Sequence, residues 1–190
     1  MWKASKYASF YEFCRRNGHV HNIGASPSAN GKCAVVAVEI AVTFLGNSGW
    51  APPPPGCFGA FVEYCDRRGR PLSPDGLTAR ELHFYIKYLN DRCGSSKTSQ
   101  ISIRVFDGNL LGGVNGKNAS EVLMKGALVD GVYVCAAYSS LRVTHCFAIK
   151  VFNCDKLIYN DNNVAVEIQA YDAEWIMGII FLRRIALYLP

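Results

Sequence analysis

The stretch Ala29-Asn30-Gly31-Lys32-Cys33-Ala34-Val35-Val36-Ala37-Val38-Glu39-Ile40-Ala41-Val42 decides how the chain is organised. A polar loop with a glycine gives way to an apolar run at Cys33, which predicts a helix over 33–45. The run is apolar almost all round, so we expect a buried helix. A thiol at a helix N-terminus loses its proton more readily, because the free N–H groups and the macrodipole favour an anion. Cys33 is therefore a candidate nucleophile; the alternative is an ordinary buried cysteine.

The composition limits the classes of protein to which the chain can belong. Its 190 residues suit one domain with a sizeable core. No apolar run is long enough to cross a membrane, so no membrane partner is expected. The formal net charge of +5 is mild, and no basic run is interleaved with aromatic residues. These features argue against a nucleic-acid partner.

The cysteines indicate a reducing compartment. The chain has 8 cysteines, and none form a Cys-x-x-Cys pair, which argues against a zinc ribbon or a thioredoxin-type site. The N-terminus lacks the basic-then-apolar pattern of a signal peptide. We therefore expect free thiols in a cytoplasmic setting, although the even count also permits disulfides. His19 and His21 have no third ligand at suitable spacing, so no metal or cofactor is expected.

Apolar periodicity and turn residues predict helices first and mainly antiparallel strands second. This order is typical of an α+β protein with segregated layers. Helices are expected over 5–16, 33–45, 57–67 and 79–92, the last opened by the capping box Thr78-Ala79-Arg80-Glu81, with a short helix from about 119. Strands are expected over 101–105, 131–138, 144–152, 156–160, 164–168 and 176–188. Residues 1–190 should form a single domain with a helical lobe over about 1–95 and a β lobe over about 96–190.

Two stretches of the β lobe give Cys33 a chemical context. His145 lies at the start of a strong strand, and the next strand ends in the polar cluster Asn160-Asp161-Asn162. A hairpin with its turn near 154 would bring that cluster beside the imidazole. Asp161, or a flanking asparagine, would then hold the tautomer and ring plane of the histidine. An imidazole can take the proton of a thiol and later protonate a leaving amine. Taken singly, His145 could be a core histidine and Asp161 part of a turn.

The order of Cys33, His145 and Asp161 resembles that of the papain-like cysteine peptidase superfamily. The resemblance implies a helical lobe packed against a mainly antiparallel sheet, with the active site in the cleft between them. Locally, residues 30–33 look like the Asp-Gly-Asn-Cys signature of ovarian-tumour-type deubiquitinases, with Asn30 in place of the aspartate. The compact size and the Thr-His-Cys-Phe-Ala segment also look like viral leader proteases.

The chain also departs from these families at three positions. Ala34 stands where the family has an aromatic residue after its nucleophile, and Pro27 replaces an upstream glutamine that donates to the oxyanion. Asn30 or backbone N–H groups would then have to serve as the oxyanion donors. Phe147 occupies the position where ovarian-tumour-type enzymes carry their acid or amide.

The resulting hypothesis is a monomeric cysteine peptidase that hydrolyses peptide or isopeptide bonds. Cys33 is the nucleophile, His145 the general base and acid, and Asp161 the orienting group, with Asn160 or Asn162 as substitutes. The resemblance implies a polypeptide substrate, either a polyprotein junction or ubiquitin or a ubiquitin-like protein. Two alternatives remain open. One is a non-enzymatic binding module that uses the Pro52-Pro53-Pro54-Pro55 stretch and exposed aromatics. The other is a transglutaminase-like acyltransferase, which shares the Cys-His-Asp order.

Overall fold

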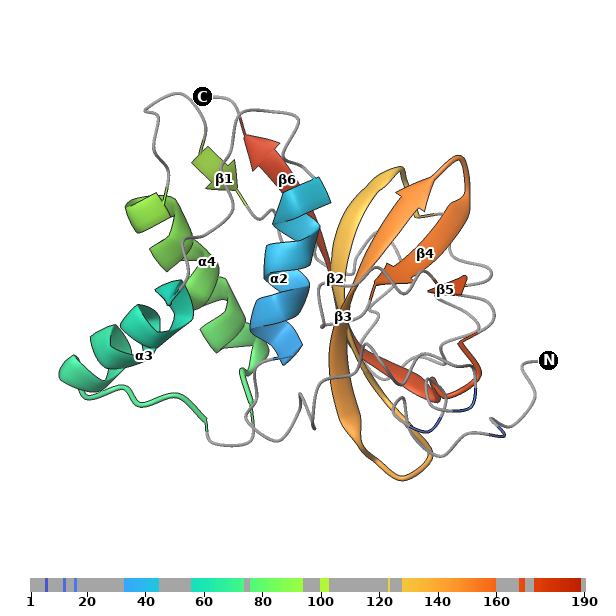
Figure 1. The fold of residues 1–190 in the computed structure, drawn as a ribbon, viewed down its shortest axis with the longest axis horizontal. Helices are drawn as coiled ribbons and strands as arrows, with labels where there is room; N and C mark the ends of the chain where they lie inside the picture. The colour runs from blue at the N-terminus through green and yellow to red at the C-terminus, as the bar shows by residue number, and fades with distance from the viewer. Residues whose placement is uncertain are drawn as a thin grey trace.

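The computed structural model shows an α+β fold, and in the residues that it describes the helices precede an antiparallel sheet (Figure 1). It describes residues 33–44, 56–73, 76–93, 100–102, 128–159, 168–169 and 173–188, together with the single residues 6, 12, 16 and 123. The predicted order of helices first and strands second is confirmed within this part of the chain. No helix among these residues is long and apolar enough to span a bilayer.

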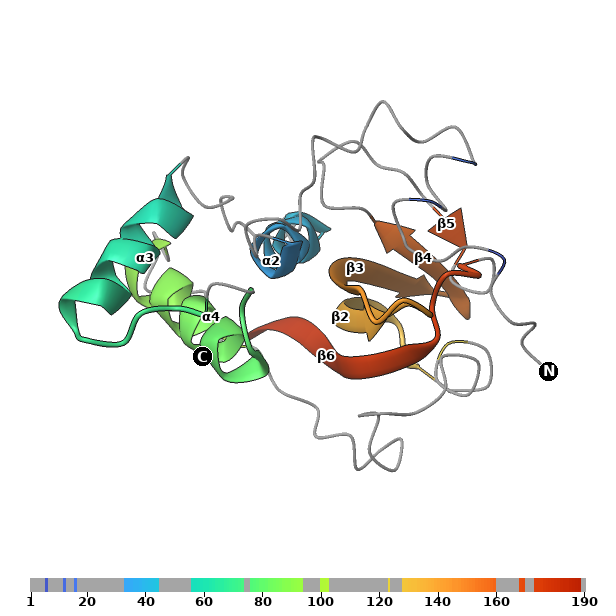
Figure 2. The ribbon, with the colours of Figure 1, turned by 90° about the horizontal axis from the view of Figure 1, so that it is seen from below.

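Helix α2, Cys33–Phe44, lies between the other two helices and the sheet (Figures 1 and 2). Its side chains are buried at most positions around the helix, from Ala34 to Val42. This confirms the prediction of a buried helix that begins at Cys33. An all-round apolar helix is stable only where both of its sides are covered, and here strands and α4 cover them.

Helices α3, Cys57–Arg67, and α4, Ala79–Cys93, form the outer part of the helical half. The predicted capping box at the start of α4 is present. The backbone N–H of Thr78 donates to Glu81 Oε2 at 2.7 Å, and the N–H of Glu81 donates back to Thr78 Oγ1 at 3.2 Å. The backbone N–H of Ser73 also donates to Glu81 Oε1 at 2.9 Å. One carboxylate thus caps a helix and fixes the segment that leads into it.

An aromatic cluster holds the two outer helices together. Phe61 of α3 is fully buried. Its ring lies 5.7 Å from Phe84, 5.0 Å from Tyr85 and 5.2 Å from Tyr88 of α4, between centroids. Tilted and edge-on contacts at these separations are favourable aromatic geometries, so Phe61 anchors α3 on α4.

The sheet has the strand order β1-β6-β2-β3-β4-β5, with antiparallel neighbours throughout. The strands are β1 Gln100–Ser102, β2 Gly131–Tyr138, β3 Thr144–Phe152, β4 Asp155–Tyr159, β5 Ile168–Gln169 and β6 Gly178–Tyr188. β2 and β3 match the predicted strands residue for residue, while β4 lies one residue earlier than predicted and β6 begins two residues later. In this order β6, the last of the described strands along the chain, lies between β1 and β2 inside the sheet.

The predicted hairpin between the third and fourth strands is confirmed. β3 and β4 pair from Phe152↔Asp155 to Ala148↔Tyr159. The two turn residues, Asn153 and Cys154, have φ values of 49° and 73°. Positive φ at both positions is typical of the two-residue turn that matches the twist of paired strands.

The sheet separates two apolar cores. On the side of α2, Val134, Ala136, Cys146 and Ala148 belong to a core shared with the three helices. On the opposite side, Cys135, Phe147 and Ile149 pack with Trp175. Because successive residues of a strand point to opposite faces, a strand covered on both sides is buried along its length, as β2 is.

Some predicted elements lie wholly or partly outside the described residues. Of the helix predicted over 5–16, Glu12 and Arg16 are described as helical and form an ion pair at 2.8 Å. Of the helix from about 119, Leu123 alone is described, as π-helical and buried, and most of the strand over 164–168 lies outside. For the strand over 101–105, the described residues give β1 at 100–102.

Candidate functional site

Cys33 is the first residue of α2 and is half-buried. Its position agrees with the sequence, in which a polar stretch gives way to an apolar run at this residue. The backbone N–H groups of a first helical turn have no partner within the helix, so they can receive an anion or a developing oxyanion. The thiol is not in a disulfide.

A pocket of about 450 Å³ brings Cys33 and His145 to one place. One wall is the start of α2, and a second is the segment that leads into α4, including Leu77 and Thr78. The remaining walls come from the strands. They are formed by Ala136 of β2, by residues 144–146 of β3, and by Ile180, Phe181 and Arg183 of β6. Two residues that are more than a hundred positions apart in the sequence therefore line the same concave surface.

His145 has a second set of neighbours behind the pocket wall. It is paired with Ala137 across the sheet, and its exposed fraction is only 5%. Its ring lies 6.1 Å from Phe147, nearly parallel at 23°, and 6.2 Å from Trp175, edge-on. These aromatic residues belong to the core on the face of the sheet away from α2. His145 thus lies between the pocket with Cys33 and an aromatic cluster.

The burial of His145 determines its protonation state. Removal of the imidazole from water lowers its pKa from 6.5 to about 4, since burial penalises the charged form. At neutral pH the ring is therefore uncharged. An imidazolium would need a nearby negative charge to be stable at this position.

Cys146 also lines the pocket, next to His145 in the sequence but on the other face of the strand. Its side chain is 3% exposed and packs in the core that contains α2. Such burial in an apolar core is the common situation of a free cysteine. Cys146 belongs to a strand and is buried, whereas Cys33 is half-buried at the start of a helix.

The structure adds pocket residues that the sequence analysis did not single out. Phe181 and Arg183 of β6 face α2 together, since they pair with Ala136 and Val134 of β2. The guanidinium of Arg183 is half-buried and donates to the carbonyl of Leu182 at 3.1 Å. A cation in an otherwise apolar row of a predicted strand is the signal that could have identified Arg183.

The segment between α3 and α4 is fixed by Glu81. Burial raises the pKa of this carboxyl, but hydrogen bonds from the hydroxyl and N–H of Thr78 and the N–H of Ser73 outweigh it, so the pKa lies below 4.5. Ser73 and Thr78 both line the pocket with Cys33. The carboxylate of Glu81 therefore holds one pocket wall in place at neutral pH.

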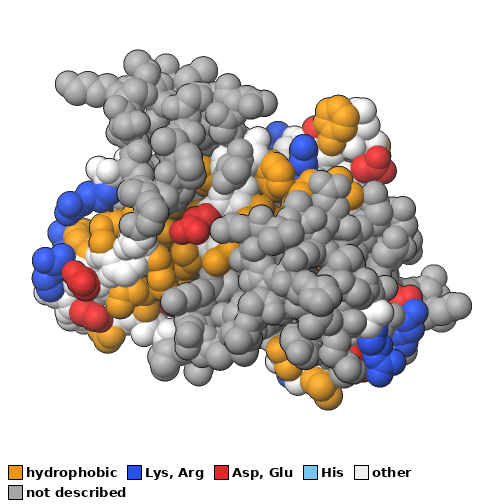
Figure 3. Space-filling view, in the orientation of Figure 1, with side chains coloured by type: hydrophobic (Ala, Val, Ile, Leu, Met, Phe, Trp, Pro, Cys, Tyr) orange, Lys and Arg blue, Asp and Glu red, His pale blue; other side chains and the backbone are white. Residues whose placement is uncertain are grey.

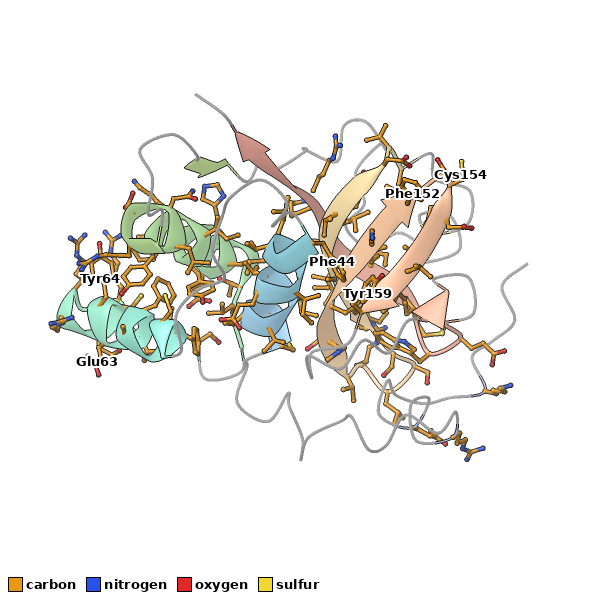
Figure 4. The ribbon with its side chains drawn as sticks, turned by 45° about the horizontal axis from the view of Figure 1, so that its top comes forward. Phe44, Glu63, Tyr64, Phe152, Cys154 and Tyr159 are labelled. Atoms are coloured by element: carbon orange, nitrogen blue, oxygen red, sulfur yellow. The ribbon has the colours of Figure 1, made fainter. Side chains whose placement is uncertain are left out.

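Asn30, Asn160, Asp161 and Asn162 lie outside the described residues. The described part of the hairpin ends at Tyr159, which is paired with Ala148, three residues after His145. Figure 4 shows Tyr159 beside Phe44 of α2, and their ring centroids lie 4.3 Å apart. The end of β4 is therefore packed against the helix that carries Cys33.

Among the described residues, no group of three or more His, Cys, Asp or Glu side chains has a geometry suited to a metal ion. No protein-family model matches the chain, and no curated protein matches it. The functional assignment therefore depends on the residues themselves.

Proposed function

We propose that the protein is a cysteine peptidase with a papain-like arrangement, in which Cys33 is the nucleophile and His145 the general base. The observation that carries the proposal is the shared pocket of a helix-start thiol and a strand-start imidazole. A helix N-terminus favours a thiolate, and a thiolate on Cys33 would supply the negative charge that an imidazolium needs at this buried position.

In the proposed reaction, His145 takes the thiol proton of Cys33, and the sulfur forms a bond to the scissile carbonyl carbon. The oxyanion faces the N–H groups at the start of α2. When the C–N bond breaks, the imidazolium protonates the leaving amine, leaving a thioester on Cys33. Water then attacks the thioester with His145 as the base, which releases the acid and regenerates the thiol. Asp161, or Asn160 or Asn162, orients the imidazole.

The pocket suits a polypeptide substrate. Leu77, Ile180 and Phe181 offer apolar contacts, and Arg183 adds a positive charge. We propose a peptide or isopeptide bond as the target, in either a polyprotein or a ubiquitin-like protein.

The test uses the other thiols of the chain as internal controls. Cys154 is exposed at the β3–β4 turn (Figure 4), whereas Cys33 is half-buried and Cys146 is buried in the same pocket. The purified chain is treated with peptide and ubiquitin C-terminal electrophiles, and the labelled cysteine is identified by mass spectrometry. We expect Cys33 to react first, and the reaction to be lost in Cys33→Ala but retained in Cys146→Ala and Cys154→Ala.

A second variant tests the base. His145→Gln is expected to slow labelling of Cys33 strongly while leaving labelling of Cys154 unchanged. Labelling that follows accessibility alone, with Cys154 first and Cys33 unaffected by His145→Gln, would contradict the proposal. Incorporation of an added amine in preference to hydrolysis would indicate an acyltransferase.

A further inference from the structure

The outer surface of α3 and α4 has two adjoining pockets whose lining does not include Cys33. The larger, about 480 Å³, is lined by Arg70, Arg80, His83 and Lys87, together with residues that include the apolar Leu72 and Phe84. The second, about 270 Å³, shares Phe84 and Lys87 with the first. Figure 3 shows Lys and Arg side chains, with Asp and Glu side chains next to them, beside hydrophobic surface at the end of the molecule that these helices form.

The charge of this surface is predominantly positive. The two pockets are lined by the cations Arg68, Arg70, Arg80, Lys87 and Arg92, which we call the basic surface. The carboxylates in the same lining are Glu81 and Asp91. Glu81 already accepts two backbone N–H groups of the segment leading into α4, so both of its oxygens are hydrogen-bonded within the chain. The surface therefore favours an anionic partner.

The aromatic residues of the surface distinguish between kinds of anion. Tyr64 of α3 (Figure 4) packs against Phe84 and Tyr88 of α4, with ring centroids 6.0 Å and 5.3 Å apart. Arg68 lies 4.4 Å above the ring of Tyr64, and Arg92 lies 5.8 Å from that of Tyr88. Ring faces covered in this way are not platforms for nucleobases. An acidic peptide offers separate carboxylates with apolar side chains between them. This arrangement matches cations that lie beside the apolar Leu72 and Phe84 better than a continuous phosphate backbone does.

We propose that the basic surface binds an acidic segment of a partner polypeptide, whose carboxylates pair with Arg80 and Lys87 and whose apolar side chain covers Phe84. This surface adjoins the thiol pocket, because residues 70–72 line one and Ser73 lines the other. Binding requires no chemistry at Cys33, so the proposal stands independently of the proposed peptidase activity.

The experiment compares two lysines that carry the same charge change. Short fluorescein-labelled peptides in which glutamate alternates with leucine or phenylalanine are titrated with the protein, and fluorescence anisotropy is recorded. Lys87→Glu should weaken binding about fivefold to tenfold, because it removes one ion pair and adds a repulsion. Lys156→Glu, on β4 and away from both pockets, should leave binding within about twofold of the parent.

Further binding measurements distinguish an acidic peptide from other ligands of the basic surface. Peptides with lysine in place of glutamate should not bind, and binding should weaken as salt is raised. Cys33→Ala should bind as the parent does. Equal weakening by Lys87→Glu and Lys156→Glu would overturn the proposal, and so would tighter binding of a single-stranded RNA than of every acidic peptide. Melting temperatures of both variants close to that of the parent would show that Lys87→Glu acts at the surface.

Discussion

The buried imidazole of His145 should make the stability of the protein depend on pH between about 4 and 6.5. Its folded-state pKa of about 4 lies below the unfolded value near 6.5. Above pH 6.5 the imidazole of His145 is uncharged in both the folded and the unfolded chain. Its titration therefore takes nothing from the free energy of unfolding at these pH values. As the pH falls towards 4, the unfolded chain binds a proton that the folded chain does not, so stability is lost. The difference of about 2.5 pH units corresponds to about 3 kcal/mol, at about 1.4 kcal/mol per unit.

The test compares the parent with His145→Gln in urea unfolding followed by tryptophan fluorescence, at pH values from neutral to below 4. Carboxylates titrate in the same range, so the informative quantity is the difference between the two proteins. As the pH falls from 6.5 to 4, the free energy of unfolding of the parent should decrease by about 3 kcal/mol relative to that of His145→Gln. As a control, Phe61→Leu removes apolar volume without removing a titratable group, so its difference from the parent should stay constant.

A direct titration provides a second readout. In a spectrum of the folded protein with labelled histidine, the resonances of His145 should keep the uncharged form until the pH approaches 4. A constant free-energy difference between the parent and His145→Gln, together with a titration of His145 near 6.5, would refute the reasoning. It would mean that water reaches the ring despite its packing against Phe147 and Trp175.

Three further substitutions test how the structure is held together. Glu81→Ala should lower the free energy of unfolding by about 1–2 kcal/mol in urea titrations, because it removes the cap of α4, whereas the exposed neighbour Arg80→Ala should change it little. Phe61→Ala should lower it by about 3–5 kcal/mol, and a smaller loss than that of Arg80→Ala would contradict the anchoring role. Burial raises the pKa of Glu39 above 4.5, while a hydrogen bond from Tyr85 lowers it. Glu39→Gln should therefore raise the melting temperature at neutral pH, and this gain should vanish at pH values well below 4.5.

Much of the fold could be predicted because local signals and tertiary packing agree in this chain. Alternation and apolar runs located β2 and β3 at their observed ends, since the turns that bound them contain residues that favour turns. The capping box of α4 was readable because its two hydrogen bonds join residues only three positions apart. The hairpin of β3 and β4 was equally local.

Properties that depend on distant parts of the chain could not be predicted. The pairing of β6 with both β1 and β2 joins residues from well-separated segments, and no local pattern specifies it. The contribution of Arg183 to the pocket follows from that pairing. The sequence predicted that Cys33 and His145 would lie near each other, but it did not show the packing of the ring against Trp175. That residue lies in a stretch with little regular structure.

The position of β6 bears on when the pocket with Cys33 can form during synthesis. β6 is the last strand among the described residues, yet it has a neighbour on each side, β2 through residues 178–185 and β1 through residues 186–188. Ile180, Phe181 and Arg183 of the same strand form part of the pocket wall. A nascent chain still lacking these residues has an open β2 edge and an incomplete pocket, so a ribosome must deliver residues 178–188 before Cys33 acquires its full surroundings.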